Sequence, residues 1–201
     1  TMSIEKRVIS GRPVELRANG EGPPTISGYA AVFYREGDPT TQYELWPGAV
    51  ERVTRGAFDG ALQRDDVRAL FNHDPQAVLG RAKAGTLQLS VDETGLRYEI
   101  TPGGTTLYKD VSTMIQRGDV DGSSFSFQIE GKDVWTLSAD GLEIRELRSV
   151  KLYDVGPVTF PAYAASTSEA RSARDSVLGQ QEREEIEREL QLRRAELSLR
   201  S

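Results

Sequence analysis

The sequence predicts an α+β domain that is mainly β up to about Pro161. Four segments alternate apolar and polar side chains, which is typical of half-buried strands. Asp92-Glu93-Thr94-Gly95 and Ala139-Asp140-Gly141 have turn chemistry and divide these segments into two pairs, so each pair predicts a hairpin. The four segments are 86–91, 96–100, 134–137 and 142–147.

Helical periodicity is clearest in 106–117, which Gly118 follows as a C-terminal cap. The apolar residues on one face of this helix are Leu107, Val111, Met114 and Ile115. A weaker helical signal covers 56–62. Strand-like composition or alternation predicts further strands, at 14–17, 26–33, 67–73, 121–129 and 150–161.

The composition changes after Pro161. Residues 164–173 are small and polar, as in a linker, and 182–200 is rich in Glu and Arg with a thin apolar stripe of Ile186, Leu190 and Leu197. The sequence therefore predicts a folded domain over 1–163 and a linker with a charged helical tail over 164–201. Such a helix is either solvated or docks on a partner or on a second copy of the chain.

Composition and charge narrow the class of protein. The chain has 201 residues and 37% hydrophobic content, enough for a sizeable core, and no apolar stretch near the ~20 residues of a membrane-spanning helix. The first residues lack the apolar region of a signal peptide, so we expect cytoplasmic residence. The net charge of −6 argues against a nucleic-acid binder. With no cysteine, disulfides, thiol catalysis and thiolate metal sites are excluded.

His73 is the one histidine of the chain, and it is the natural general base for nucleophilic catalysis near neutral pH. It follows the strand-like run Val67, Ala69, Phe71 on the same predicted face, and Asn72-His73-Asp74-Pro75 marks the end of that run. Strand ends are where catalytic groups reach a cleft. The alternative is a core histidine whose ring is satisfied by neighbours.

Ser124 is the candidate nucleophile. In a strand over 121–129, Ser123 shares a face with Phe125 and Phe127, whereas Ser124 faces the other way, and the nearby Gly122 lets a substrate backbone approach. A serine in this position is by itself usually structural. We expect Ser123 to turn toward the core.

Asp154 places a carboxylate on the side of its strand that carries Val150, Leu152 and Val158, where a core residue is expected. A buried ionised carboxylate needs a partner, and His73 is a suitable one because a catalytic imidazole needs a carboxylate to hold its tautomer. The alternative is a bulge or a solvated strand end.

Several short motifs then occur in a fixed order between Ile26 and Ala162. They are Gly28-Tyr29-Ala30-Ala31-Val32-Phe33, Pro47-Gly48-Ala49, Gly56-Ala57-Phe58, Phe71-Asn72-His73-Asp74, Leu79-Gly80-Arg81, Gly85-Thr86-Leu87, Ser124-Phe125-Ser126-Phe127, Leu152-Tyr153-Asp154-Val155 and Thr159-Phe160-Pro161-Ala162. In this order and spacing the chain resembles the tailed-bacteriophage prohead (capsid maturation) serine protease family, which is related to the herpesvirus assemblin proteases.

The resemblance implies a small closed β-barrel flanked by helices, with Ser124 as nucleophile, His73 as general base and Asp154 in the third position. Two departures stand out. Ser126 replaces the glycine of the family's usual Phe-Gly-Phe, and the third residue is often Glu, which is one methylene longer than Asp154. Asp74 is the next candidate for the third role, and Arg81 is a weaker candidate for stabilising the oxyanion.

The function implied is a serine endopeptidase that cleaves capsid scaffold or precursor, and itself, inside the assembling prohead in the host bacterial cytoplasm. No metal or organic cofactor is implied, and the partners are the capsid precursor or scaffold and a possible second copy of the chain. One rival is a catalytically silent scaffold protein of the same fold. A second is a metal-dependent hydrolase built on His73 and Asp74, for which one histidine supplies few ligands.

Overall fold

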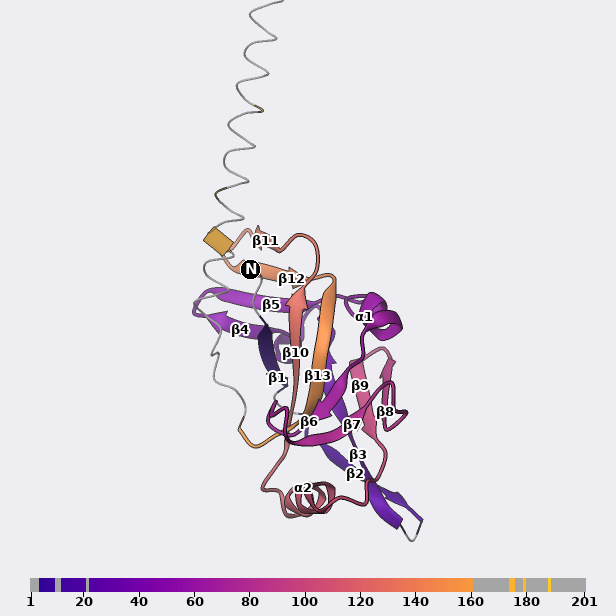
Figure 1. The fold of residues 1–201 in the computed structure, drawn as a ribbon. Helices are drawn as coiled ribbons and strands as arrows, with labels where there is room; N and C mark the ends of the chain where they lie inside the picture. Colours follow the sequence, from indigo (N-terminus) through magenta and orange to yellow (C-terminus); the bar gives the residue numbers. More distant parts are fainter. Residues whose placement is uncertain are drawn as a thin grey trace, which may run out of the picture.

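A computed structural model describes residues 4–9, 12–20, 22–160, 174, 175, 179 and 188. Three β-sheets form its body, with helices α1 (Asp59–Arg64) and α2 (Thr106–Arg117) on the periphery (Figure 1). The prediction of a mainly β domain is therefore confirmed. The short helix η1 (Pro39–Thr41) comes directly before β4 (Tyr43–Trp46) in the chain.

The first sheet carries the strands that position the site. In spatial order the strands are β1 (Glu5–Ile9), β10 (Gly122–Ile129), β13 (Val150–Val158), β6 (Arg68–Leu70) and β7 (Val78–Arg81). β10 is antiparallel to both of its neighbours, β1 and β13, and β6 runs parallel to β13. The predicted strand at 67–73 is wrong in its second half, because the chain leaves the sheet after Leu70 and turns.

The second sheet contains the first predicted hairpin. The strand order is β2 (Glu15–Asn19), β3 (Gly22–Val32), β9 (Gly95–Ile100) and β8 (Leu87–Val91). β8 and β9 pair antiparallel on either side of the Asp92 turn, as expected, and Thr94 N and Gly95 N both donate to Asp92 Oδ1.

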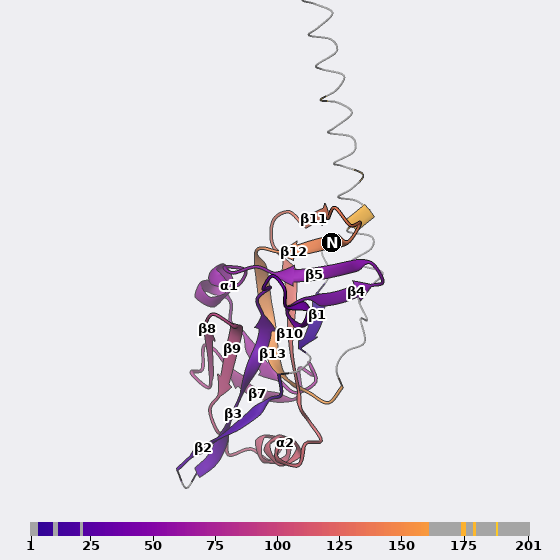
Figure 2. The same cartoon turned by 180° about the vertical axis from the view of Figure 1, so that it is seen from behind.

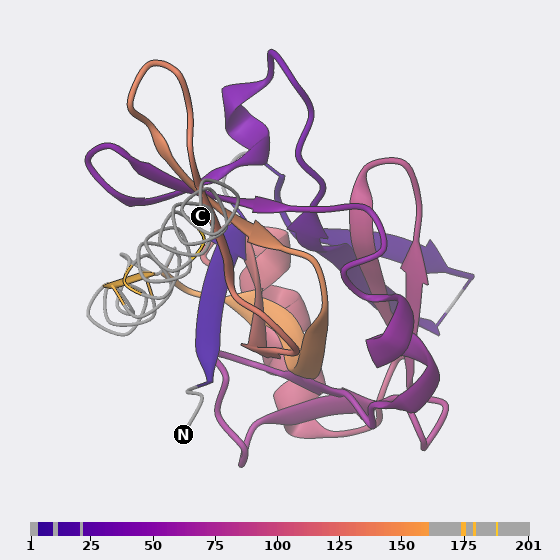
Figure 3. The ribbon, with the colours of Figure 1, turned by 90° about the horizontal axis from the view of Figure 1, so that it is seen from above.

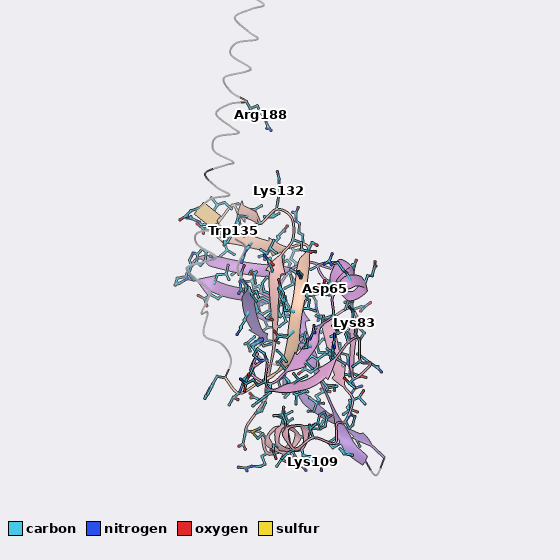
Figure 4. All side chains as sticks on the ribbon, in the orientation of Figure 1. Asp65, Lys83, Lys109, Lys132, Trp135 and Arg188 are labelled. Atoms are coloured by element: carbon cyan, nitrogen blue, oxygen red, sulfur yellow. The ribbon has the colours of Figure 1, made fainter. Side chains whose placement is uncertain are left out.

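The third sheet contains the second predicted hairpin, β11 with β12. Its order is β11 (Val134–Leu137), β12 (Glu143–Leu147), β5 (Ala49–Val53) and β4 (Tyr43–Trp46). Figure 3 shows the turns of the β4–β5 and β11–β12 hairpins projecting from the body. Trp46 and Trp135 stack there with ring centroids 5.6 Å apart, and in Figure 4 Trp135 lies at the end of the molecule opposite to Lys109 of α2.

The helix predicted at 106–117 forms with those bounds. Thr105 Oγ1 accepts a hydrogen bond from Tyr108 N at the start of α2, and Gly118 ends it with φ 80°. Tyr108 Oη donates to the Pro24 carbonyl oxygen, which ties α2 to β3. Seen from behind, α2 lies at the end of the molecule next to β2 and β3 (Figure 2).

The closed barrel is not confirmed. Among the described residues the strands pair within three separate sheets, and no strand pairing joins an edge of one sheet to an edge of another. The sheets are held together by packing, since β3 lies against β1, β10 and β13. Directly before α1, Phe58 packs edge-on against Phe125 of β10 at a centroid distance of 5.7 Å.

A buried charge network joins β1 to the third sheet. Arg7 Nε donates to Glu51 Oε1 at 2.6 Å, and Arg145 Nη1 donates to Glu5 Oε2 at 2.7 Å. Arg145 also donates to Asp133. The sequence pattern did not predict β1, because the buried positions of this strand include the charged residues Glu5 and Arg7 instead of apolar ones.

The predicted linker and most of the predicted tail helix lie outside the described residues, and so does the expected domain division at 163/164. The described tail positions are helical, and Arg174 Nε donates to Glu143 Oε2 of β12 at 3.0 Å. Within the described part of the chain, no helix has the length and apolar character needed to cross a membrane.

Candidate active site

β10 presents its side chains to two environments. Phe125 and Phe127 stack in the core with centroids 5.0 Å apart, and the buried Ser123 Oγ lies 2.8 Å from Tyr98 Oη. Burial, only partly opposed by the bond with Ser123, raises the pKa of Tyr98, so this phenol stays neutral. Ser124 contacts the His73 ring instead. The prediction that Ser123 turns toward the core and Ser124 away from it is confirmed.

The ladder between β10 and β13 sets Asp154 opposite Ser126, and Gly156 opposite Ser124. Directly opposed residues in such a ladder have Cβ atoms about 4.5–5.5 Å apart. The register shifts just beyond this pair, so Tyr153 is an extra residue on β13. Asp154 is 7% exposed, which confirms that a carboxylate occupies a buried position on this strand.

His73 sits in a turn that follows β6. Asn72 and His73 both have left-handed backbones, with φ of 56° and 57°, which non-glycine residues adopt only when their surroundings hold them. Asn72 provides that support, because its backbone N donates to the Pro157 carbonyl oxygen and its Oδ1 accepts from Thr159 N at 2.8 Å. The end of β13 thus fixes the turn that carries the histidine.

The His73 ring bridges the two other predicted residues. Its Nδ1 lies 2.5 Å from Asp154 Oδ1, and its Nε2 lies 2.6 Å from Ser124 Oγ. The side chains of His73 and Asp154 are about one-tenth exposed. A neutral ring with its proton on Nδ1 donates to the carboxylate and leaves the Nε2 lone pair free to accept the serine proton. Three side chains separated by up to 81 residues in the sequence therefore meet in the arrangement that proton transfer from a serine requires.

Ser124 has a second acceptor within reach. Its Oγ lies 2.7 Å from the carbonyl oxygen of Arg7 on β1, and the residue is fully buried. A hydroxyl carries one proton, so it donates either to Arg7 or to His73. When the His73 ring carries both protons, Nε2–H donates to Ser124 Oγ and the hydroxyl turns to Arg7.

Asp154 has a further partner that the sequence did not point to. Ser126 Oγ donates to Asp154 Oδ2, the carboxylate oxygen that does not contact His73. Alternation along β10 places Ser126 on the face of Ser124 and was the available signal. The contact itself depends on the register of β13, which the sequence does not display.

The sequence was compared with models of known protein families. The model of the caudovirus prohead serine protease family matches residues 12–180 of the chain. The chain belongs to this prohead protease family. The family resemblance expected from the motifs is thereby confirmed. No curated protein matches the sequence.

Among solved structures, the chain is similar to the bacteriophage T4 capsid assembly protease gp21. The identity is 13%, the match covers 78% of this chain and 96% of that one, and the TM-score is 0.45.

Asp74 and Arg81, which the sequence also suggested for the site, make their hydrogen bonds with other residues than His73. Asp74 Oδ1 accepts from Gln76 N at 2.8 Å, which holds the turn after His73. Arg81 donates through Nε to Asp66 at 2.9 Å, and this hydrogen bond lowers the pKa of Asp66 to about 2. Within the described ranges, no group of three His, Asp or Glu side chains is placed to hold a metal ion.

Proposed function

We propose that this protein is a serine endopeptidase that cleaves capsid precursor or scaffold, and itself, during prohead maturation in the host bacterial cytoplasm. Membership of the prohead serine protease family supports the reaction class. The observation that carries the assignment of residues is the His73 ring, with Nε2 at 2.6 Å from Ser124 Oγ and Nδ1 at 2.5 Å from Asp154 Oδ1.

Ser124 Oγ attacks the scissile carbonyl carbon while His73 Nε2 takes its proton, and Asp154 stabilises the imidazolium that forms. The imidazolium then gives that proton to the leaving amine as the carbon–nitrogen bond breaks. A water that passes its proton to His73 hydrolyses the acyl-enzyme and releases Ser124. The contact of Ser124 with the Arg7 carbonyl has to be given up before the hydroxyl turns to His73.

Mass spectrometry of the capsid precursor after incubation with the protein tests this proposal. Wild type should yield discrete fragments, and Ser124→Ala and His73→Ala should yield none while retaining the wild-type fold by circular dichroism. Ser123→Ala is the matched control. Ser123 is a buried serine of the same strand, but its hydroxyl bonds to Tyr98, so the Ser123→Ala variant should still cleave the precursor. Cleavage by Ser124→Ala would overturn the assignment.

The full burial of Ser124 favours a second candidate, a catalytically silent scaffold protein of the same fold. A fluorophosphonate probe separates the two. In an active enzyme Ser124 Oγ forms a bond to phosphorus, fluoride leaves, and the serine proton passes to His73. Labelling at Ser124 that is lost in His73→Ala supports the protease. A wild-type chain that stays unlabelled supports the silent scaffold.

A further inference from the structure

Ser126 is a buried polar residue that the mechanism above does not use. It is 1% exposed, it lies two residues after Ser124 on β10, and it is the ladder partner of Asp154. Its hydroxyl donates to Asp154 Oδ2, whereas Asp154 Oδ1 faces His73 Nδ1. The two oxygens of one carboxylate are thus divided between a serine and the histidine.

We propose that Ser126 is a positioning residue of the catalytic site, which fixes the Asp154 carboxylate so that Oδ1 meets His73 Nδ1. The inference rests on the proposed roles of Ser124, His73 and Asp154. The last torsion of an aspartate is broad and roughly two-fold, so the backbone of β13 alone does not determine which way the carboxylate plane points. The hydroxyl of Ser126, which is held on the neighbouring strand, determines this orientation by donating to one oxygen of the carboxylate.

The ladder makes this support rigid. Ser126 and Asp154 face each other across β10 and β13, and the nucleophile Ser124 is on the same strand as Ser126. One strand therefore sets both the position of the attacking oxygen and the orientation of the carboxylate. Loss of the Ser126 hydroxyl would also leave a lone pair of a buried carboxylate without this donor, which is costly in a site of low exposure.

The first test is a double-mutant cycle read by the rate of fluorophosphonate labelling at Ser124. Ser126→Ala should slow labelling by about 10–100-fold, the size of loss that follows when the partner orienting a metal-ligating side chain is removed. Ser126→Ala added to Asp154→Ala should cost nothing further, because there is then no carboxylate to position. If the two losses multiply, Ser126 acts through packing and the proposal is wrong.

Ser123→Ala is the matched control for the loss of a buried hydroxyl. It lies on the same strand, is fully buried, and bonds to Tyr98 instead of Asp154. Its labelling rate should stay at the wild-type value, and thermal unfolding of each variant should show that it is folded. An equal loss in Ser123→Ala and Ser126→Ala would contradict a specific role for Ser126.

The second test does not depend on activity. Because His73 is the one histidine of the chain, the ring proton on Nδ1 gives a single assignable resonance in ¹⁵N-histidine-labelled protein. A firmly held bond to Asp154 keeps this proton shifted downfield and protected from exchange with water. Ser126→Ala should move the resonance upfield and broaden it, and Ser123→Ala should leave it unchanged.

The two tests separate this inference from the proposed function. If Ser124→Ala is still labelled, or wild type is not, the proposed protease site fails, and the Nδ1 resonance alone decides whether Ser126 orients Asp154. If Ser124→Ala and His73→Ala are both inert but Ser126→Ala matches wild type in labelling rate and resonance, the protease site stands and the role of Ser126 is refuted.

Discussion

Gly156 lies opposite Ser124 in the β10–β13 ladder, and a Cβ atom built on it would lie 2.2 Å from the Leu70 carbonyl oxygen. Leu70 is the last residue of β6, directly before the turn that carries His73. With φ of 154°, Gly156 also has a backbone conformation that side chains disfavour. The absence of a side chain at Gly156 therefore allows the turn that carries His73 to pack closely against β10 and β13, the strands that carry Ser124 and Asp154.

Gly156→Ala should disrupt the site. The added methyl has to displace the Leu70 backbone, so we expect a loss of about 1–3 kcal/mol in the free energy of unfolding and loss of Ser124 labelling. Urea unfolding and fluorophosphonate labelling measure the two effects. Gly141→Ala is the control for backbone strain, because Gly141 has φ of 84° and open space around it. It should be destabilised and still labelled. Full labelling of Gly156→Ala would show that the turn tolerates displacement.

Asp154→Asn tests the third position. An amide can donate to His73 Nδ1, which favours the tautomer whose Nε2 cannot accept the serine proton, and well-formed triads lose on the order of 10⁴-fold in kcat from this change. The measurement is the rate of precursor cleavage. A loss below about tenfold would mean that the tautomer is held elsewhere, with Asp74→Asn as the next variant to assay.

The parts of the site that the sequence predicts are those set by local periodicity. The alternation of 121–129 correctly separates Ser123 from Ser124, and the spacing and caps of 106–117 give α2 its bounds. The Ser126–Asp154 bond instead depends on a bulge near Tyr153, and the left-handed backbone of His73 depends on hydrogen bonds between Asn72 and residues 85 and 87 positions later in the chain. Long-range register leaves no local signal.

β1 illustrates the same limit in the fold. Its Glu5 and Arg7 are tolerated inside because Glu51 and Arg145, which lie 44 residues from Arg7 and 140 from Glu5, neutralise them there. A pattern of charged residues at alternate positions normally indicates a solvated face. Glu51 and Arg145, the partners that allow Glu5 and Arg7 to be buried, belong to the third sheet, so the burial of β1 can be recognised only when that sheet lies beside it.

The pH dependence of stability should report on this network through Glu5. Burial opposes ionisation of Glu5, but the hydrogen bonds and charges of Arg145 and Arg7 outweigh it and lower its pKa below the ordinary value. A lowered folded-state pKa means that this contribution is fully present above the unfolded pKa of about 4.5 and is lost as the pH falls through the folded value. Urea unfolding between neutral and acidic pH should show that loss.

Glu5→Gln should remove this acid-dependent component and destabilise the protein at neutral pH by about 3–5 kcal/mol, because Arg145 and Arg7 are left buried with one partner fewer. Glu15→Gln is the control, since Glu15 is an exposed carboxylate on β2 and should leave the pH profile as in wild type. An unchanged slope in Glu5→Gln would place the acid-sensitive groups elsewhere.

The segment after Pro161 should be dispensable for chemistry and required for delivery to the prohead. Ser124, His73 and Asp154 all precede it, and the described contact of the tail with the body, Arg174 on Glu143, lies on the third sheet, which carries none of the three. The Glu- and Arg-rich sequence of 182–200 has too thin an apolar stripe to form a core by itself, and it suits docking on a scaffold, a capsid precursor or a second copy.

A chain ending at Ala165 should therefore be labelled at Ser124 at the wild-type rate and yet be missing from isolated proheads. Quantitative mass spectrometry of proheads assembled with the truncated chain measures its copy number, and full-length Ser124→Ala is the control that should be packaged although it is inert. If the truncated chain is packaged at the wild-type copy number, the tail has no role in delivery. If it is packaged normally but is no longer labelled, the tail supports the catalytic domain itself, and the division of labour between the two segments is wrong.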